Sequence, residues 1–100
     1  MNQNQLAKIY GEVQELRIEE RILLKRYHEC EQAILTAALE GNFDLIPNLA
    51  EEMQSNKHRR RLIIGSVDFR WRKVKDSGHD VSEPAKAYWS IGQKTKVQVN

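Results

Sequence analysis

The sequence predicts an all-α protein, an antiparallel hairpin of two long helices with a short third helix near the C-terminus. Three observations support this prediction: an apolar seam at helical spacing over residues 6–37, a second one over residues 49–74, and a short Gly- and Pro-containing connection between them. A length of 100 residues supplies one domain. We therefore expect a single helical domain over residues 1–92 and a C-terminal tail over residues 93–100.

The seam of the first helix starts at Leu6 and continues in alternating steps of three and four residues. Nine of its ten positions carry apolar or aromatic side chains; the positions are Leu6, Ile9, Val13, Leu16, Glu20, Leu23, Tyr27, Cys30, Ile34 and Ala37. Such a seam is typical of coiled coils. Gly41 suits the left-handed residue that ends many helices. We expect one helix over residues 4–40, roughly 55 Å long at about 1.5 Å per residue.

A second long helix is predicted to follow a short connection and to end at about Lys75. Two start signals compete: Asp44 as N-cap with Pro47 in the first turn, or Asn48 as N-cap with Glu51 three residues later. Because the connection is short, the two long helices are expected to be antiparallel neighbours. The apolar face of the second helix comprises Leu49, Met53, Ile63, Ile64, Val67, Trp71 and Val74, and it is interrupted by Asn56 and Arg60.

Ser82 and Pro84 predict the start of a third helix over about residues 83–91, which carries Tyr88, Trp89 and Ile91. Polar side chains on the two seams predict contacts between the long helices. An unpaired charge at Glu20 would cost several kcal/mol, and the expected register favours Arg70 as its partner. Tyr27 is expected to lie level with Arg60.

The net charge of +2 conceals an uneven distribution along the chain. Residues 1–56 carry five basic and ten acidic side chains, a net charge of −5, and residues 57–100 carry eleven basic and four acidic ones, a net charge of +7. Residues 57–75 alone hold eight Lys or Arg and one Asp. This stretch is therefore the first candidate for a binding surface.

We expect partner binding through the basic stretch and the C-terminal aromatic segment, by Arg59, Arg61, Phe69, Arg70, Arg72, Lys73 and Trp89. Ile18 and Ile22, four residues apart and off the seam, form a second contact candidate. Structural roles stay open for both sets. The basic side chains are also suited to pairing with the acidic first helix, and the third helix or the tail could cover the two isoleucines.

The pattern favours a non-catalytic small regulatory protein, an adaptor, chaperone or inhibitor, that binds an acidic surface of another protein. A nucleic-acid-processing complex is one such target, and regulators of this size include those of phages and mobile elements. Arg and aromatic residues dominate interface energies, and the mixed overall charge favours a protein partner. Direct nucleic-acid binding by the same basic helix is the alternative, and a homodimer is a further option.

No catalytic, cofactor or metal site is expected. Side chains two residues apart on a helix point about 200° apart, so His28 and Cys30 cannot share an ion. Cys30 lies on the seam and is expected to be a small buried residue. The sequence lacks phosphate-binding loops, a signal-peptide pattern and an apolar run near the ~20 residues of a membrane helix. With one cysteine, a cytoplasmic protein without membrane contact is expected.

Overall fold

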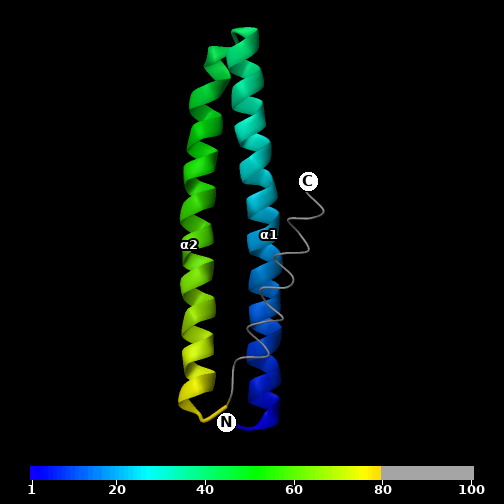
Figure 1. The fold of residues 1–100 in the computed structure, drawn as a ribbon, viewed down its shortest axis with the longest axis vertical. Helices are drawn as coiled ribbons and strands as arrows, with labels where there is room; N and C mark the ends of the chain where they lie inside the picture. The colour runs from blue at the N-terminus through cyan, green and yellow to red at the C-terminus, as the bar shows by residue number, and fades with distance from the viewer. Residues whose placement is uncertain (80–100) are drawn as a thin grey trace.

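The structure, a computed structural model, describes residues 1–79. These residues form α1 (Gln3–Glu40), a short 3-10 turn η1 (Phe43–Leu45) and α2 (Ile46–Asp76), with no strand among them. The two long helices lie side by side, and the chain reverses direction at η1 (Figure 1). The all-α class is confirmed for this part of the chain. The predicted third helix, the boundary at residue 92 and Trp89 lie outside the described residues.

Both ends of α1 are closed by hydrogen bonds. At the start, the Asn2 side chain accepts from the Gln5 backbone N–H at 2.9 Å, while the Asn2 N–H donates to Gln5 Oε1 at 3.0 Å. This capping box satisfies two backbone donors. At the end, Gly41 takes φ 77°, and the Asn42 N–H donates to the Ala37 carbonyl at 2.8 Å. The predicted stop at Gly41 is confirmed.

The start of α2 differs from both predicted signals. The helix begins at Ile46, with Pro47 in its first turn, and no side chain caps it. Asp44 lies within η1 and Asn48 lies within α2, so neither is the N-cap. The 3-10 turn provides the physical reason. The N–H groups of Leu45 and Ile46 donate to carbonyls three residues earlier, which leaves fewer donors for a side-chain cap.

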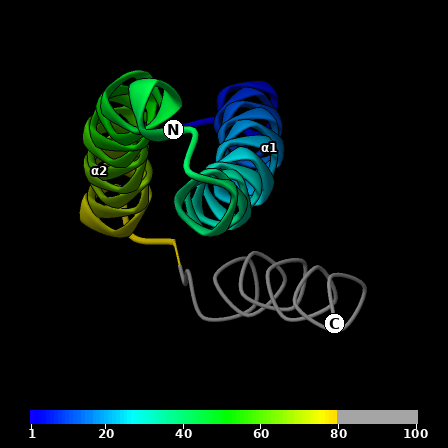
Figure 2. The ribbon, with the colours of Figure 1, turned by 90° about the horizontal axis from the view of Figure 1, so that it is seen from above.

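The core is a single layer of side chains between α1 and α2. Figure 2 shows the two helices end-on. The buried residues of the core are Ile9, Val13, Ile63, Val67 and Val74, and Leu6, Leu16, Leu23 and Trp71 pack against them. Tyr10 adds a tilted ring contact to Trp71, with 5.9 Å between centroids. Ile64, predicted on the apolar face, is 50% exposed. It follows the fully buried Ile63 and is therefore rotated by about 100° from the core.

Charged side chains join the two helices at intervals along their length. Three ion pairs bridge α1 and α2: Glu12 with Arg70 at 2.8 Å, Glu19 with Arg59 at 2.8 Å, and Arg26 with Glu52 at 2.7 Å. From one pair to the next along α1, the residue on α1 and its partner on α2 both lie closer to the turn. The helices therefore run in opposite directions (Figure 1).

The predicted pairing of Glu20 with Arg70 is wrong. Glu20 is buried and pairs with Arg17 on its own helix at 2.8 Å, while Arg70 bonds Glu12 and Ser66. Since Glu19 lies opposite Arg59, Glu20 is about eleven residues from Arg70 along α2, roughly 16 Å along the axis.

The contact expected between Tyr27 and Arg60 is present. The Arg60 guanidinium lies 5.8 Å from the Tyr27 ring centroid, within the range of cation–π attraction. Asn56, the other polar residue on the α2 seam, is buried and donates from Nδ2 to the Leu23 carbonyl at 2.6 Å. These two side chains are therefore part of the contact between the helices.

Candidate interaction surfaces

The basic residues predicted to bind a partner divide into two groups on α2. The first group faces α1. Arg59 donates from Nε and Nη2 to the two carboxylate oxygens of Glu19, at 2.8 and 3.1 Å. Arg70 donates from Nε and Nη2 to Glu12, at 3.1 and 2.8 Å. The bonds from Arg59 lower the pKa of the Glu19 carboxyl. These two arginines therefore help to join the helices.

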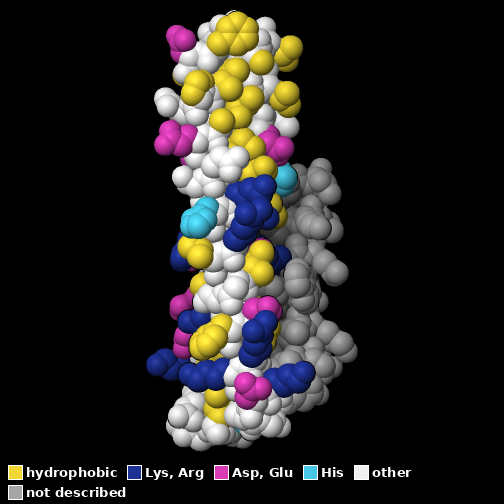
Figure 3. Space-filling view, turned by 90° about the vertical axis from the view of Figure 1, so that its left-hand side faces the viewer, with side chains coloured by type: hydrophobic (Ala, Val, Ile, Leu, Met, Phe, Trp, Pro, Cys, Tyr) yellow, Lys and Arg dark blue, Asp and Glu magenta, His cyan; other side chains and the backbone are white. Residues whose placement is uncertain are grey.

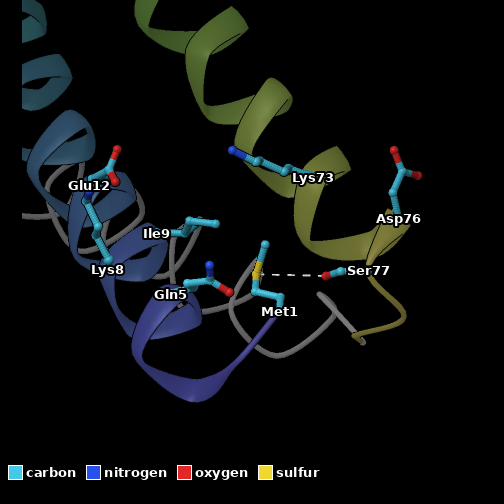
Figure 4. A pocket seen from close by; sticks show the side chains of 8 residues that line it. All are labelled: Met1, Gln5, Lys8, Ile9, Glu12, Lys73, Asp76 and Ser77. Carbon is cyan, nitrogen blue, oxygen red and sulfur yellow. Dashed lines mark hydrogen bonds between the residues drawn. The ribbon is translucent and has the colours of Figure 1, made fainter.

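The second group is exposed: Arg61 and Arg72 lie on the side of α2 away from α1, and Lys73 lies at the edge of that side and extends toward α1 (Figure 4). We define the outer face of α2 as six exposed residues: Arg61, Leu62, Gly65, Phe69, Arg72 and Lys73. Spacings of three and four residues place Leu62, Gly65 and Phe69 on one side of the helix. Leu62 is 52% and Phe69 65% exposed. Figure 3, which views the molecule from the α2 side, shows apolar side chains interspersed with Lys and Arg over this part of the helix.

Few carboxylates of the hairpin pair with the cations of the outer face. Within residues 1–79, no carboxylate pairs with Arg61 or Lys73. Arg72 lies 3.9 Å from Asp68, and both side chains are largely exposed. A surface pair of that kind contributes little to stability. Three cations thus surround two exposed apolar side chains.

Gly65 has no evident role within the hairpin. A Cβ atom added there would meet nothing within 4 Å. Glycine in a helix interior costs roughly 1 kcal/mol relative to alanine, and no close contact in the hairpin explains this cost. Its missing side chain leaves space between Leu62 and Phe69.

The other predicted contact residues are in different places. Ile18 and Ile22 are 52% and 65% exposed on α1, so the described part of the chain does not cover them. Trp89 lies outside the described residues. Lys73, besides its place on the outer face, lines a shallow pocket between the free ends of the two helices (Figure 4). The other residues lining this pocket are Met1, Gln5, Lys8, Ile9, Glu12, Asp76 and Ser77.

The charges of this pocket are balanced, because two lysines and two carboxylates line it. Its one internal hydrogen bond drawn in Figure 4 runs from the Ser77 hydroxyl to the Met1 sulfur, at 3.8 Å. Balanced charge gives it no preference for anions or cations. The pocket therefore adds no site to the outer face of α2.

Sequence reasoning missed a cluster of exposed apolar side chains at the turn. Leu35, Leu39, Phe43 and Leu45 are each more than half exposed, and Leu39 reaches 89%. A usable signal was present. Residues 27–56 contain no Lys or Arg, and four large apolar residues fall within eleven positions around the connection. The charge count by halves of the chain obscured this segment.

The described residues that could carry chemistry lie apart from one another. Cys30 is 1% exposed, its thiol donates to Glu52 at 3.3 Å, and burial raises its pKa. His28 contacts Glu31 on the surface at 3.0 Å. Across residues 1–79, no three His, Cys, Asp or Glu side chains are grouped as metal ligands. Over the same range, neither helix has the length and apolar character needed to cross a membrane.

Comparisons with protein-family models, curated proteins and solved structures found no match to this chain.

Proposed function

We propose that this protein is a non-catalytic regulator, an adaptor, chaperone or inhibitor, that binds an acidic surface of another protein through the outer face of α2. The observation that carries the proposal is the combination of exposed Leu62 and Phe69 with three cations that make no strong ion pair within residues 1–79. Apolar anchors supply affinity when they are buried, and surrounding charges align the partner and accelerate association.

The size of the surface favours a reversible complex. From Arg61 to Lys73 the helix advances by about 18 Å, which suits one helix or strand of a partner. Contacts of this extent fall at the small end of specific interfaces, where binding is transient. Trp89 is proposed as an additional anchor. A cytoplasmic location is also proposed, because a lone thiol such as Cys30 suits a reducing compartment.

The alternative is direct nucleic-acid binding by the same helix, with Arg59, Arg61, Arg70, Arg72 and Lys73 on phosphates. The ion pairs of the hairpin make this alternative weaker. Arg59 and Arg70 each hold a carboxylate, so two of these five cations would bring a negative charge near the phosphates. Phosphate binding gains its free energy from released counterions, and internal neutralisation reduces that gain.

A charge-reversal experiment tests the proposal. The face variant carries Arg61→Glu and Arg72→Glu, and the control carries Lys8→Glu and Lys25→Glu on α1, with the same change in net charge. Each tagged protein is used to capture partners from nuclease-treated extract of its native cells, and captured proteins are quantified by mass spectrometry. The face variant should lose a protein that the wild type and the control retain. Equal capture by both variants would overturn the proposal.

Titration with generic DNA and RNA at several salt concentrations tests the alternative. Micromolar or tighter binding with a steep salt dependence would make nucleic acid the primary partner. We expect no binding at low salt, which would remove that alternative.

A further inference from the structure

The turn end of the hairpin carries an exposed apolar patch, which we call the tip and define as Leu35, Leu39, Phe43 and Leu45. Figure 3 shows apolar side chains gathered at this end of the molecule. All four residues are more than half exposed. Leu35 and Leu39 lie two positions before and after the buried Ala37 and so point away from α2, whereas Phe43 and Leu45 lie in η1 at the end of the hairpin. Isolated exposed apolar residues are normal, but several at one end of a molecule mark an interaction site.

The charge around the tip has one sign. Residues 27–56, which form the turn-side half of the hairpin, contain six Asp or Glu and no Lys or Arg. The remaining described residues contain thirteen Lys or Arg and six Asp or Glu, an excess of seven positive charges. The hairpin is therefore acidic at the tip and basic toward its free ends.

We propose that the tip binds the outer face of α2 of a second copy of this chain. Each of these surfaces has exposed apolar side chains at its centre. Around the tip, Glu40, Asp44 and Glu51 are exposed carboxylates, and around the outer face Arg61, Arg72 and Lys73 are exposed cations. Opposite charges therefore meet when the tip of one copy contacts the outer face of another. Contacts between two tips, or between two outer faces, would instead bring like charges together.

The contact has to form between molecules. From Asp44 to Gly65 the chain advances by 21 residues, about 32 Å along one continuous helix, so a hairpin cannot bring its tip to its own outer face. Figure 3 shows apolar side chains of the turn end and of α2 on the same side of the molecule. Two antiparallel copies can therefore make the contact twice around a two-fold axis through the turn residues Phe43 and Leu45, which closes the assembly as a dimer. Leu35 and Leu39, on the other side of the tip, lie outside this contact. Gly65 leaves space at the centre of the outer face for Phe43 of the second copy.

Formation of this dimer covers the outer face of α2. A protein partner with an acidic surface would then compete with the tip for the same cations. The dimer does not depend on the partner proposed above, because it needs only the two surfaces of this chain. The two proposals can therefore fail separately.

Two variants test the dimer. The tip variant carries Phe43→Ser and Leu45→Ser, and the face variant carries Leu62→Ser and Phe69→Ser. All four side chains are exposed, so at high salt, where the wild type is a monomer, both variants should keep its circular dichroism spectrum and melting temperature. Sedimentation equilibrium of the full chain at low salt should show a wild-type dimer that dissociates as salt is added. Each variant should raise the dimer dissociation constant by about tenfold or more.

Mixing the variants identifies which surfaces meet. The tip variant retains an intact outer face and the face variant retains an intact tip, so a mixture restores one of the two contacts. Fluorescently labelled tip variant should bind added face variant, and it should not bind added unlabelled tip variant. A monomeric wild type, variants that dimerise as the wild type does, or a mixture without binding would each overturn the proposal. The tip variant should still capture the protein partner, which separates this result from failure of the proposed function.

Discussion

Ile63 and Ile64 offer a direct test of how α2 faces α1. They are adjacent residues of one type on the same helix, but Ile63 is fully buried and Ile64 is 50% exposed. Ile63→Ala removes three buried carbons from the centre of the core, for which large-to-small changes cost about 2–5 kcal/mol. The higher helix propensity of alanine offsets a few tenths of a kcal/mol of this cost. We expect a net loss of about 3 kcal/mol in the free energy of unfolding.

Ile64→Ala removes apolar surface that is only half buried, which lowers the free energy of unfolding by about 1 kcal/mol, and the higher helix propensity of alanine offsets part of this loss. The expected net loss is below about 0.7 kcal/mol. Urea denaturation followed by circular dichroism at low protein concentration measures both values. With a slope of about 1–1.5 kcal/mol/M, Ile63→Ala should lower the midpoint by roughly 2–3 M. Equal shifts for the two variants would show that α2 does not present Ile63 to α1, and the assigned outer face would fail with it.

Three further predictions concern the contacts between the helices. Asn56→Leu should raise the free energy of unfolding by about 1 kcal/mol in the same assay, because the buried Asn56 Oδ1 lacks a hydrogen-bond partner in the described structure. A lower free energy of unfolding would show that the hydrogen bond from Asn56 to the Leu23 carbonyl outweighs the cost of burying Oδ1. Hydrogen bonds from Arg26 lower the pKa of Glu52 in the folded protein. The pair therefore stabilises the fold at pH values above the pKa of an unfolded glutamate, and this stabilisation is lost as the pH falls through the pKa of Glu52 in the folded protein. Denaturation at pH 7 and at pH 3 should therefore show a smaller pH dependence for Glu52→Gln than for the wild type, and identical dependence would contradict this assignment. Cys30 should react with iodoacetamide much more slowly in the folded protein than in urea, because burial raises its thiol pKa and restricts access; equal rates would refute its burial.

Local signals were sufficient to predict most of the secondary structure. The seam and Gly41 predicted α1 to within one residue at each end, because a left-handed glycine and an apolar period act within a few residues of chain. The start of α2 was harder to predict. Asp44 and Asn48 both resemble N-caps, but a 3-10 turn satisfies the backbone donors that these side chains would otherwise accept from.

Contacts between the helices could not be predicted with the same accuracy. The pairing of Glu20 depended on the register of the two helices, and Arg70 lies several turns of α2 away from the level of Glu20. For the same reason, the sequence alone could not distinguish Arg59, which pairs with α1, from Arg61, which faces away. These two arginines are two residues apart and so lie about 200° apart around the helix.

The charge distribution shows how the fold changes an argument from sequence. Along the chain, the first half is acidic and the second half is basic. In the hairpin, the acidic end of α1 and the acidic start of α2, both within the first half, come together at the tip. The contrast in charge is therefore between the tip and the free ends of the hairpin, and a count by halves of the chain does not show it.

Substitution of Gly65 tests whether the outer face of α2 binds a partner. Gly65→Gln and the matched Gly11→Gln place the same side chain at two helix positions where an added Cβ meets nothing within 4 Å. Both variants should raise the free energy of unfolding by roughly 0.5–1 kcal/mol. In quantitative capture from native-cell extract, Gly65→Gln should lose the partner, while Gly11→Gln should retain it at the wild-type level. Equal retention of the partner by both variants would contradict the claim.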